Sequence, residues 1–387
     1  MTWWLFGALT FGVWGLFVAF ASERRAVKQK DPVQDQVGVT VFKPLKGLVP
    51  GLRENLEAFC GQTHPTLQII LGAEDSTDPA LEVARAVQRA HPERNILVLA
   101  GTPRSALNPK VSNLLHFERF ARHPFVLISD ADVRPHPEYV SNMLRVMKDP
   151  TVGLVHSPLI CRADDSDASL LESLHFNTWV NLAVIGCGRL VDQPIVVGKS
   201  MLLRRTALQD IGGLQAFADV LAEDYLIGQT LASTGWRVRD AGEGVAVHME
   251  GRRLAQFRER ISRWAQMRFR INPFAYLCEV LLNPSIWCLI TLIAGLLKQE
   301  GWMVIGVAGL LVKWHVERRL FSRWCGMELS LSDVPMLLVK DLAVTIAWLR
   351  GPFVSQVNWS GNRRRVTWGS RLKTVEKPKS AAVRVAR

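Results

Sequence analysis

The hydrophobic and polar positions along this chain predict an apolar N-terminal segment, a long α/β region and an apolar C-terminal part. Thr2 to Ala21 is an unbroken apolar run, close to the roughly 20 residues that a helix needs to span a bilayer. It has no preceding basic segment and no clear cleavage site, so the pattern favours an uncleaved anchor over a signal peptide. We therefore predict a transmembrane anchor at residues 1–22. The positive-inside rule places the following domain in the cytosol, because four basic residues come next: Arg24, Arg25, Lys28 and Lys30.

Between residues 36 and 272, short β-rich runs alternate with amphipathic helical patterns. This alternation predicts an α/β domain, Rossmann-like, with a mostly parallel sheet. The fourth strand, Phe125 to Ile128, is apolar throughout, as expected for a strand that is buried on both faces. The expected strands are 37–42, 67–73, 95–99 and 125–128, with helices at 53–60 and 79–90.

Two acids follow the fourth strand, at Asp130 and Asp132. Acids at the carboxyl ends of parallel strands face the ligand crevice of an open sheet. Two carboxylates on a turning backbone can bind one hard divalent cation that carries diphosphate oxygens. A solvated turn or a helix cap gives the same pattern, so this pair alone leaves both interpretations open. Asp75 ends an earlier strand and is expected at the same edge.

Three further patterns carry candidate chemistry. Gly198 lies in a β-rich segment, where glycine marks a close approach of backbone or ligand. Glu223 and Asp224 open an apolar helix, although acids are also favourable at any helix N-terminus. Arg260 and Arg263 share one helical face, and an exposed basic helix is the alternative interpretation.

The C-terminal part contains further apolar segments. Residues 277–297 are apolar enough to span a bilayer, with Asn283-Pro284 marking a kink, and 302–312 is a shorter candidate. Only four residues separate the two segments, so we expect a helical hairpin. Residues 335–349 carry Lys340 and Asp341, which favours an interfacial or re-entrant helix over a full span. We assign 275–350 to transmembrane or interfacial helices and 351–387 to a basic cytosolic tail.

Composition narrows the class of protein. The chain has 387 residues, is 48% hydrophobic and carries a formal charge of +12. Ten Lys and Arg residues from Arg350 onward face the single acid Glu376, which favours attraction to anionic lipid head groups. Nucleic-acid binding is the rival, but no helix-turn-helix or zinc pattern supports it. The six cysteines form no C-x-x-C pair, so we expect free thiols in a reducing compartment.

Taken in order, these motifs resemble a known family. Asp75, Asp130-x-Asp132, Glu223-Asp224 and Arg260-x-x-Arg263-Trp264 resemble the D, D-x-D, E-D and (Q/R)-x-x-R-W motifs of inverting GT-A glycosyltransferases of the family-2 type. The similarity is closest to glycosyltransferase family 21, the ceramide glucosyltransferase branch. Animal members lack the second carboxylate of D-x-D, so Asp132 departs toward the general form and favours metal use. Supporting matches include the segments 43–47, 78–80, 108–110, 153–156, 222–225 and 235–237.

The resemblance implies donor-binding roles for several residues. Asp75 accepts from the uracil or ribose of a UDP-sugar, and the loop that begins at Lys43 packs on the nucleotide. Lys110 supplies positive charge near phosphate. Two arginines clamp the diphosphate with permanent charge, and a tryptophan beside them closes the site toward the acceptor: Arg260, Arg263 and Trp264.

The resemblance also implies the catalytic and metal-binding roles. Asp130 and Asp132 hold Mg²⁺ or Mn²⁺, with His248 as a further metal or phosphate ligand, and the metal assists departure of UDP. Asp224 is the general base on the acceptor hydroxyl. The expected acceptor side is formed by Gly198, Glu223 and Trp264.

The sequence therefore predicts a membrane-bound inverting transferase that moves a hexose from a UDP-sugar to a lipid hydroxyl, with UDP-glucose and ceramide as first choice. The alternatives are a hopanoid N-acetylglucosaminyltransferase and a non-catalytic basic membrane-binding protein of the same fold. A processive polysaccharide synthase would need more spans. The expected partners are a UDP-sugar, a lipid acceptor (ceramide or hopanoid) and a membrane, without nucleic acid. We expect an integral protein of a bacterial inner membrane, with a cytosolic catalytic domain.

Overall fold

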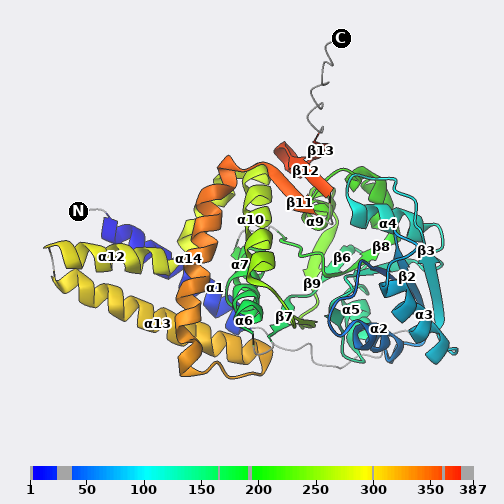
Figure 1. Ribbon diagram of the computed structural model, residues 1–387, viewed down its shortest axis with the longest axis horizontal. Helices are drawn as coiled ribbons and strands as arrows, with labels where there is room; N and C mark the ends of the chain where they lie inside the picture. The colour runs from blue at the N-terminus through cyan, green and yellow to red at the C-terminus, as the bar shows by residue number, and fades with distance from the viewer. Residues whose placement is uncertain are drawn as a thin grey trace, which may run out of the picture.

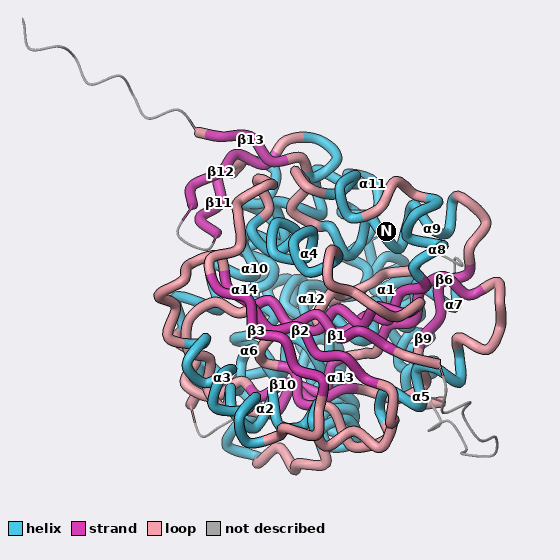
Figure 2. Tube along the Cα trace, turned by 90° about the vertical axis from the view of Figure 1, so that its right-hand side faces the viewer, coloured by secondary structure: helices cyan, strands magenta, loops and turns pink. Residues whose placement is uncertain are grey.

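A seven-stranded sheet lies at the centre of the α/β region (Figures 1 and 2). The computed structural model describes residues 3–23, 37–163, 166–190, 194–298, 300–359 and 362–375. The basic residues at positions 24–30 and the end of the predicted tail, 376–387, lie outside these ranges.

The central sheet has the order β3-β2-β1-β4-β8-β6-β9. Strands β3, β2, β1 and β4 are parallel to one another, and β8 runs antiparallel between β4 and β6. The α/β class with a mostly parallel sheet is confirmed. The bounds are β1 (Val39–Pro44), β2 (Leu67–Ala73), β3 (Asn95–Ala100), β4 (Phe125–Ser129), β6 (Val152–His156), β8 (Ser200–Arg204) and β9 (Arg237–Asp240).

Helices cover both faces of this sheet. Along β2, Ile69 and Leu71 join one hydrophobic cluster and Ile70 joins the other, because successive side chains of a strand point to opposite faces. This double burial explains the continuous apolar runs of the strands. One face packs on α2 (Leu52–Cys60), α3 (Ala80–Ala90) and α5 (Tyr139–Val146), and the other on α4 (Pro109–Glu118), α8 (Arg205–Asp210) and α9 (Glu223–Ser233).

Two three-stranded sheets accompany the central one. The first has the order β5-β10-β7 and the second β11-β12-β13. The second sheet shows that the predicted tail begins with folded chain. Their strands are β5 (Val133–Arg134), β7 (Leu159–Arg162), β10 (Val245–His248), β11 (Gln356–Trp359), β12 (Asn362–Val366) and β13 (Leu372–Thr374). The connecting helices are α6 (Asp167–His175), the π-helix η1 (Phe176–Val180), α7 (Asn181–Leu190), η2 (Leu214–Phe217) and α10 (Leu254–Ile271).

Helix α1 (Trp3–Ser22) covers most of the predicted anchor. Its residues Trp14 and Ala21 are buried against Leu182 and Ile185 of α7, whereas Phe6 remains half exposed. By length and composition, Trp4–Ser22 is the one described helix that can cross a membrane alone.

Helices α12 (Pro284–Lys298) and α13 (Glu300–Cys325) form an arm beside the α/β domain (Figure 1). The chain bends by 62° at Asn283, between η3 and α12, which places the break at the expected kink. The bent pair is a second candidate span only if both halves count as one. The other helices of the C-terminal part are α11 (Pro273–Cys278), η3 (Glu279–Leu282), η4 (Leu331–Asp333), α14 (Val334–Arg350), η5 (Gly351–Phe353) and η6 (Trp368–Ser370).

The two charges in the middle of α14 lie inside the protein. Lys340 and Asp341 are 0% and 2% exposed. Asp341 pairs with Lys313 of α13 at 2.7 Å, and Lys340 pairs with Glu317 at 3.2 Å. The charges in α14 are therefore explained by ion pairs with α13. The sequence of α14 alone could not reveal these partners.

Candidate active site

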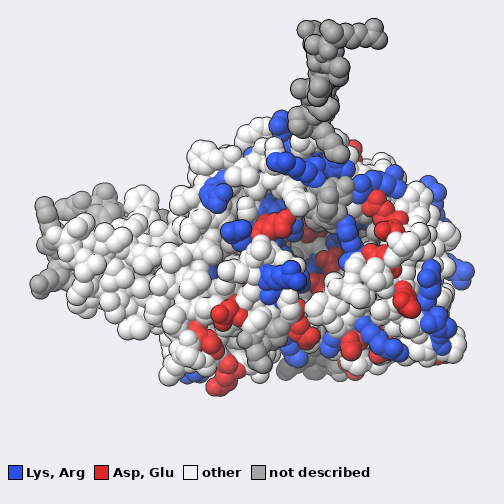
Figure 3. Space-filling view, in the orientation of Figure 1, with Lys and Arg blue, Asp and Glu red and all other residues white. Residues whose placement is uncertain are grey.

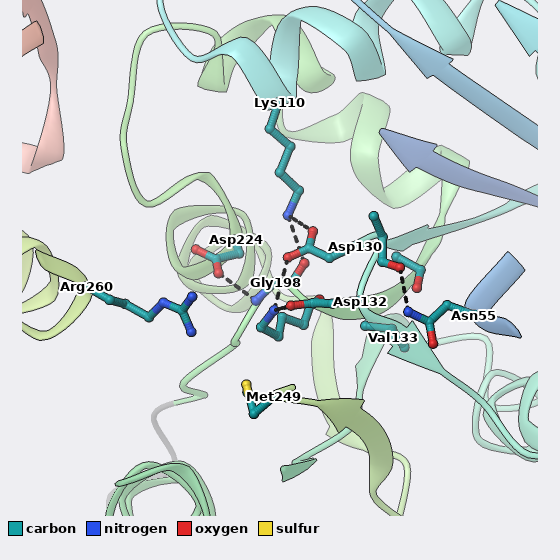
Figure 4. A network of polar contacts seen from close by, with 12 residues as sticks. Asn55, Lys110, Asp130, Asp132, Val133, Gly198, Asp224, Met249 and Arg260 are labelled. Carbon is teal, nitrogen blue, oxygen red and sulfur yellow. Dashed lines mark hydrogen bonds and ion pairs between the residues drawn. The ribbon is translucent and has the colours of Figure 1, made fainter. Parts of the chain in front are cut away.

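The acidic turn (Asp130–Asp132) lies directly after β4 (Figure 4). The Asp130 amide donates to the Lys199 carbonyl at 2.9 Å, which ties the turn to the start of β8. From α2, the Asn55 side chain donates to the Ala131 carbonyl at 3.1 Å. The backbone of the turn is thus fixed by two neighbouring elements, and its carboxylates remain available for other partners.

Lys43, at the end of β1, lies beneath the acidic turn. Its ammonium donates to the carbonyls of Asp130 at 2.8 Å and Val133 at 3.3 Å. The side chain is fully buried, and burial lowers its pKa to about 7. The structure therefore brings Lys43 to the backbone of the turn; contact with a nucleotide remains a prediction for the loop that follows it.

Three cations surround the carboxylates of the acidic turn. Lys110 lies 2.9 Å from Asp130, and Lys199 lies 2.6 Å from Asp132, which Arg252 also approaches to 3.1 Å. Although burial raises the pKa of Asp132, the charges of Lys199 and Arg252 outweigh it and hold this pKa well below its usual range. Asp132 is therefore anionic at neutral pH.

The acid pair at the start of α9 lies on the other side of Lys110. Asp224 accepts from the Gly198 amide at 2.5 Å and from the Tyr225 amide at 2.8 Å. Glu223 lies 3.3 Å from the Lys110 ammonium, which also donates to the Gly198 carbonyl. Burial raises the pKa of Asp224 and brings that of Glu223 to about 7. A carboxylate with a raised pKa is a better proton acceptor than an exposed one.

The space beside Gly198, which the sequence assigned to the acceptor, is filled by the Asp224 side chain. A Cβ at this position would lie 2.5 Å from the Asp224 Cβ. The glycine therefore makes room for Asp224, whereas space for the acceptor remains a prediction.

Asn108 connects Lys110 with the acid pair. Its side-chain oxygen accepts from the Lys110 and Val111 amides and so caps α4, as asparagine commonly does. Its amide group donates to Glu223 at 3.0 Å and to the Val220 carbonyl at 2.9 Å. One side chain thus fixes the first turn of α4 relative to that of α9.

Arg260 of α10 also faces the acidic turn, and Figure 4 shows its guanidinium pointing toward Asp132. Arg260 pairs with Glu172, a buried residue of α6 that also lies 3.5 Å from Arg252. Burial lowers the pKa of Arg260, and burial followed by the Arg260 charge lowers that of Arg263 to about 10. Both remain cations at neutral pH. Trp264 packs against Phe176 with ring centroids 5.4 Å apart.

Two predicted residues stand apart from this network. The Asp75 carboxylate is exposed and accepts from the Thr77 hydroxyl and amide, which lowers its pKa. His248 lies 3.6 Å from Glu250, and burial lowers its pKa. Within the described ranges, neither side chain contacts the acidic turn, so the structure does not bring His248 to Asp130 and Asp132.

The acidic turn offers carboxylate oxygens to a divalent cation, but fewer than a metal site made only of protein groups would need. In the described portion of the chain, no three His, Cys, Asp or Glu side chains are grouped to hold a metal. Mg²⁺ often uses only one or two carboxylates together with substrate phosphates. The Asp130 side chain is 30% exposed and suits this role, whereas Lys199 occupies both oxygens of Asp132. The residues therefore fit a metal that diphosphate helps to bind, with Asp130 as its first ligand.

The residues that the sequence analysis did not select lie between the recognised motifs. Lys199 directly follows Gly198, and Asn108 lies two residues before Lys110. This closeness in the sequence was the only sign that either residue belongs to the site. Glu172 and Arg252 gave no signal, because their partners lie 88 and 120 positions away in the chain. Only their contacts in the folded chain, and no sequence motif, identify Glu172 and Arg252 as part of the site.

The sheet order and the acidic turn after β4 give this chain an α/β fold of the GT-A type. A solved structure of mannosyltransferase PcManGT from Pyrobaculum calidifontis, in complex with GDP-Man and Mn²⁺, has a similar fold. The match covers 91% of this chain and 99% of that chain, with TM-score 0.50 and 18% identity.

The particular family follows from the sequence match. The model of glycosyl transferase family 21 matches residues 6–372, and the chain belongs to this family. Ceramide glucosyltransferase 1 of Caenorhabditis elegans is 26% identical over 92% of this chain and 77% of its own length. Ceramide glucosyltransferase 3 of the same organism is 24% identical over 87% and 74%. The recognition of the family and the assignment as a glycosyltransferase are confirmed.

Proposed function

We propose that this enzyme transfers glucose from UDP-glucose to the primary hydroxyl of ceramide, with inversion at the sugar carbon. The observation that carries the proposal is the convergence of Asp224, Lys110 and Asp130 in one polar network, with Arg260 pointing toward it (Figure 4). Ceramide is proposed because the family's relatives above are named for it.

In the proposed mechanism, Asp224 removes the proton from the acceptor hydroxyl as that oxygen attacks the sugar carbon. Its two oxygens are held by backbone amides, so the base keeps its orientation without a reorganisation cost. General-base catalysis of this kind contributes about 10²–10⁴-fold. Attack from the face opposite the departing diphosphate inverts the anomeric carbon, and the α-linked donor gives a β-linked product.

The departing UDP takes negative charge onto its diphosphate. Arg260 and Arg263 are proposed to bind that diphosphate, and Lys110 supplies a third cation beside it. A Mg²⁺ or Mn²⁺ ion bound with Asp130 and Asp132 would add positive charge to the leaving oxygens. Asp75 and the loop after Lys43 are proposed to bind the nucleoside, with Glu223, Gly198 and Trp264 on the acceptor side.

The acceptor is proposed to arrive from a membrane. The arm formed by α12 and α13 exposes apolar side chains, and Figure 3 shows its visible face without acidic or basic residues. This composition suits contact with lipid, and the donor then arrives from the cytosol. The most exposed apolar residues of the arm are Leu296, Leu297, Val304, Leu311 and Ile293.

A panel of labelled UDP-sugars and lipid acceptors tests the proposal. The full chain, purified in detergent, is incubated with each pair and the lipid product is identified by mass. Glucosylceramide from UDP-glucose is the expected product. Transfer of N-acetylglucosamine to a hopanoid would replace the proposed substrates, and the absence of transfer from every donor would contradict the proposed activity.

A further inference from the structure

The predicted basic tail has a folded part that contacts the segment in front of Asp224. We call residues 362–374, which form β12, η6 and β13, the C-terminal brace. Val220 and Arg371 form an antiparallel bridge, and the Leu372 amide donates to the Asp219 carbonyl at 2.7 Å. The brace thus extends the backbone pairing right up to the start of α9.

Ser370 makes the contacts nearest to the acid pair. Its carbonyl accepts from the Leu221 amide at 2.8 Å, and its hydroxyl oxygen accepts from the Ala222 amide at 3.1 Å. Amides at a helix N-terminus have no partner within the helix, so Ser370 supplies acceptors that α9 cannot. Asp224 lies two residues beyond Ala222.

The backbone of Ser370 is held in a conformation that serine rarely adopts. Its φ is 60°, and it is the one residue other than glycine with positive φ in the described ranges. A left-handed non-glycine residue has an energetic cost, and Ser370 is completely buried. The surrounding contacts therefore impose this geometry.

The opposite side of the same segment is also fixed. The Asp219 carboxylate accepts from the Leu107 amide at 2.9 Å, and Asn108 donates to the Val220 carbonyl. The brace also reaches α10, where Trp368 lies 5.7 Å from Phe269 between ring centroids. It consequently joins the helix that carries Asp224 to the helix that carries Arg260.

We propose that Ser370 is a positioning residue, and that the C-terminal brace holds the start of α9 so that Asp224 stays against Gly198. The effect on rate rests on the proposed function, whereas the brace itself can be tested without any substrate.

The test compares Ser370→Ala and Ser370→Gly in the full chain, with Ser233→Ala as the matched control. Ser233 lies at the other end of α9, where its hydroxyl donates to Thr230 within the helix. Hydrogen exchange of the Leu221 and Ala222 amides is measured first. Loss of the hydroxyl acceptor should raise the exchange rate of the amide about fivefold, which corresponds to the net free energy of one ordinary hydrogen bond. We expect the Ala222 amide to exchange about fivefold faster in both Ser370 variants, whereas Leu221 keeps the Ser370 carbonyl as its acceptor and serves as the internal reference. Exchange should be unchanged in Ser233→Ala.

Steady-state kinetics and melting temperature then separate positioning from stability. Glycine adopts positive φ without cost, so Ser370→Gly should melt above Ser370→Ala. Both variants lack the hydroxyl, so both should lose about fivefold in kcat, with the KM for UDP-glucose within twofold of the unmodified enzyme. If kcat instead follows the melting temperature, Ser370 is only structural and the positioning role is overturned.

The two proposals fail in distinguishable ways. An enzyme that transfers no glucose to ceramide contradicts the proposed function and leaves the exchange result to decide the brace. Unchanged exchange of the Ala222 amide in Ser370→Ala overturns the brace, whatever the activity.

Discussion

Lys110 is the residue at which the two acidic groups of the site meet. Its ammonium is 2.9 Å from Asp130 and 3.3 Å from Glu223. Burial works to lower its pKa, but the charges of Asp130, Glu223 and Asp224 outweigh it and raise that pKa. Lys110 is therefore a cation at neutral pH, and its charge offsets the repulsion between Asp130 and the Glu223–Asp224 pair.

The raised pKa of Asp224 predicts the pH dependence of the reaction. The base must be deprotonated, so kcat should fall as pH decreases through a pKa above the usual value of about 4. The groups facing Asp224 are Lys110 of α4, Asp130 after β4 and its neighbour Glu223. Replacing Lys110 by Gln removes the charge that stabilises the carboxylate, so the acid limb should move to higher pH by about one unit. A kcat profile with an unmoved acid limb would refute this assignment.

Gly198 offers a steric test of the same base. In Gly198→Ala the new Cβ would meet Asp224 at 2.5 Å, which must displace the carboxylate. We expect kcat to fall at least about tenfold, as small misplacements of catalytic groups do. The control is Gly188→Ala in α7, where nothing lies within 4 Å of the new Cβ. Equal activity of the two variants would show that Asp224 needs no such room.

At the residue scale, the sequence predicted the groups that carry recognisable motifs. Asp130 and Asp224 could be selected because each follows a local pattern in a fixed order. Lys199, Arg252 and Glu172 could not, because their function comes from partners that only the folded chain brings together. Sequence motifs therefore reveal residues such as Asp130 more readily than the oppositely charged residues, such as Lys199, that form ion pairs with the acidic turn.

At the element scale, the buried strands were the most predictable part of the fold. Strand β2 has the bounds expected from its apolar run, 67–73, and β4 extends that of Phe125 to Ile128 by one residue. Strands β11 to β13 were not predicted, because their short basic segments gain a hydrophobic face only by packing on Leu221. The charge in this segment suggested a solvated tail. Tertiary contacts instead fold its first part into a sheet.

The pairing of α13 with α14 is an element-scale feature with a measurable effect on stability. Lys313 is completely buried and lies 2.7 Å from both Glu317 and Asp341. In Lys313→Met two acids lose a buried partner, which commonly costs about 3–5 kcal/mol. Thermal unfolding in detergent should shift strongly downward. Arg319→Met changes an exposed cation of the same helix and should leave the transition nearly unchanged; a similar shift in both would argue against the pairing.

At the scale of the whole molecule, the arm projects from a body rich in charged side chains, and its visible face shows no acidic or basic side chain (Figure 3). Helix α12 has 15 residues, which corresponds to about 22 Å of helix. This is shorter than the roughly 30 Å hydrocarbon core of a bilayer. Helix α1 has 20 residues and can cross it. The arm is therefore proposed to enter the membrane beside α1 and to bring the lipid acceptor near α10.

Charges placed on the arm test this arrangement. Leu296 and Leu297 are 74% and 73% exposed, and Leu331 of η4, outside the arm, is 76% exposed. The double variant Leu296→Lys, Leu297→Lys should weaken vesicle binding and lower activity on long-chain ceramide in vesicles, because lysine in hydrocarbon is costly. Activity on a short-chain soluble acceptor should remain. Leu331→Lys should change neither, and a double variant that binds vesicles normally would contradict the proposed arm.

The most direct measurement of the central claim is the anomeric configuration of the product, made by the unmodified enzyme and by Asp224→Asn from UDP-glucose and ceramide. We predict β-glucosylceramide from the unmodified enzyme, identified by its proton NMR coupling constant. In Asp224→Asn the rate should fall by about 10²–10⁴-fold, with UDP-glucose affinity nearly unchanged. An α-linked product, or comparable turnover by Asp224→Asn, would contradict inverting transfer with Asp224 as the base.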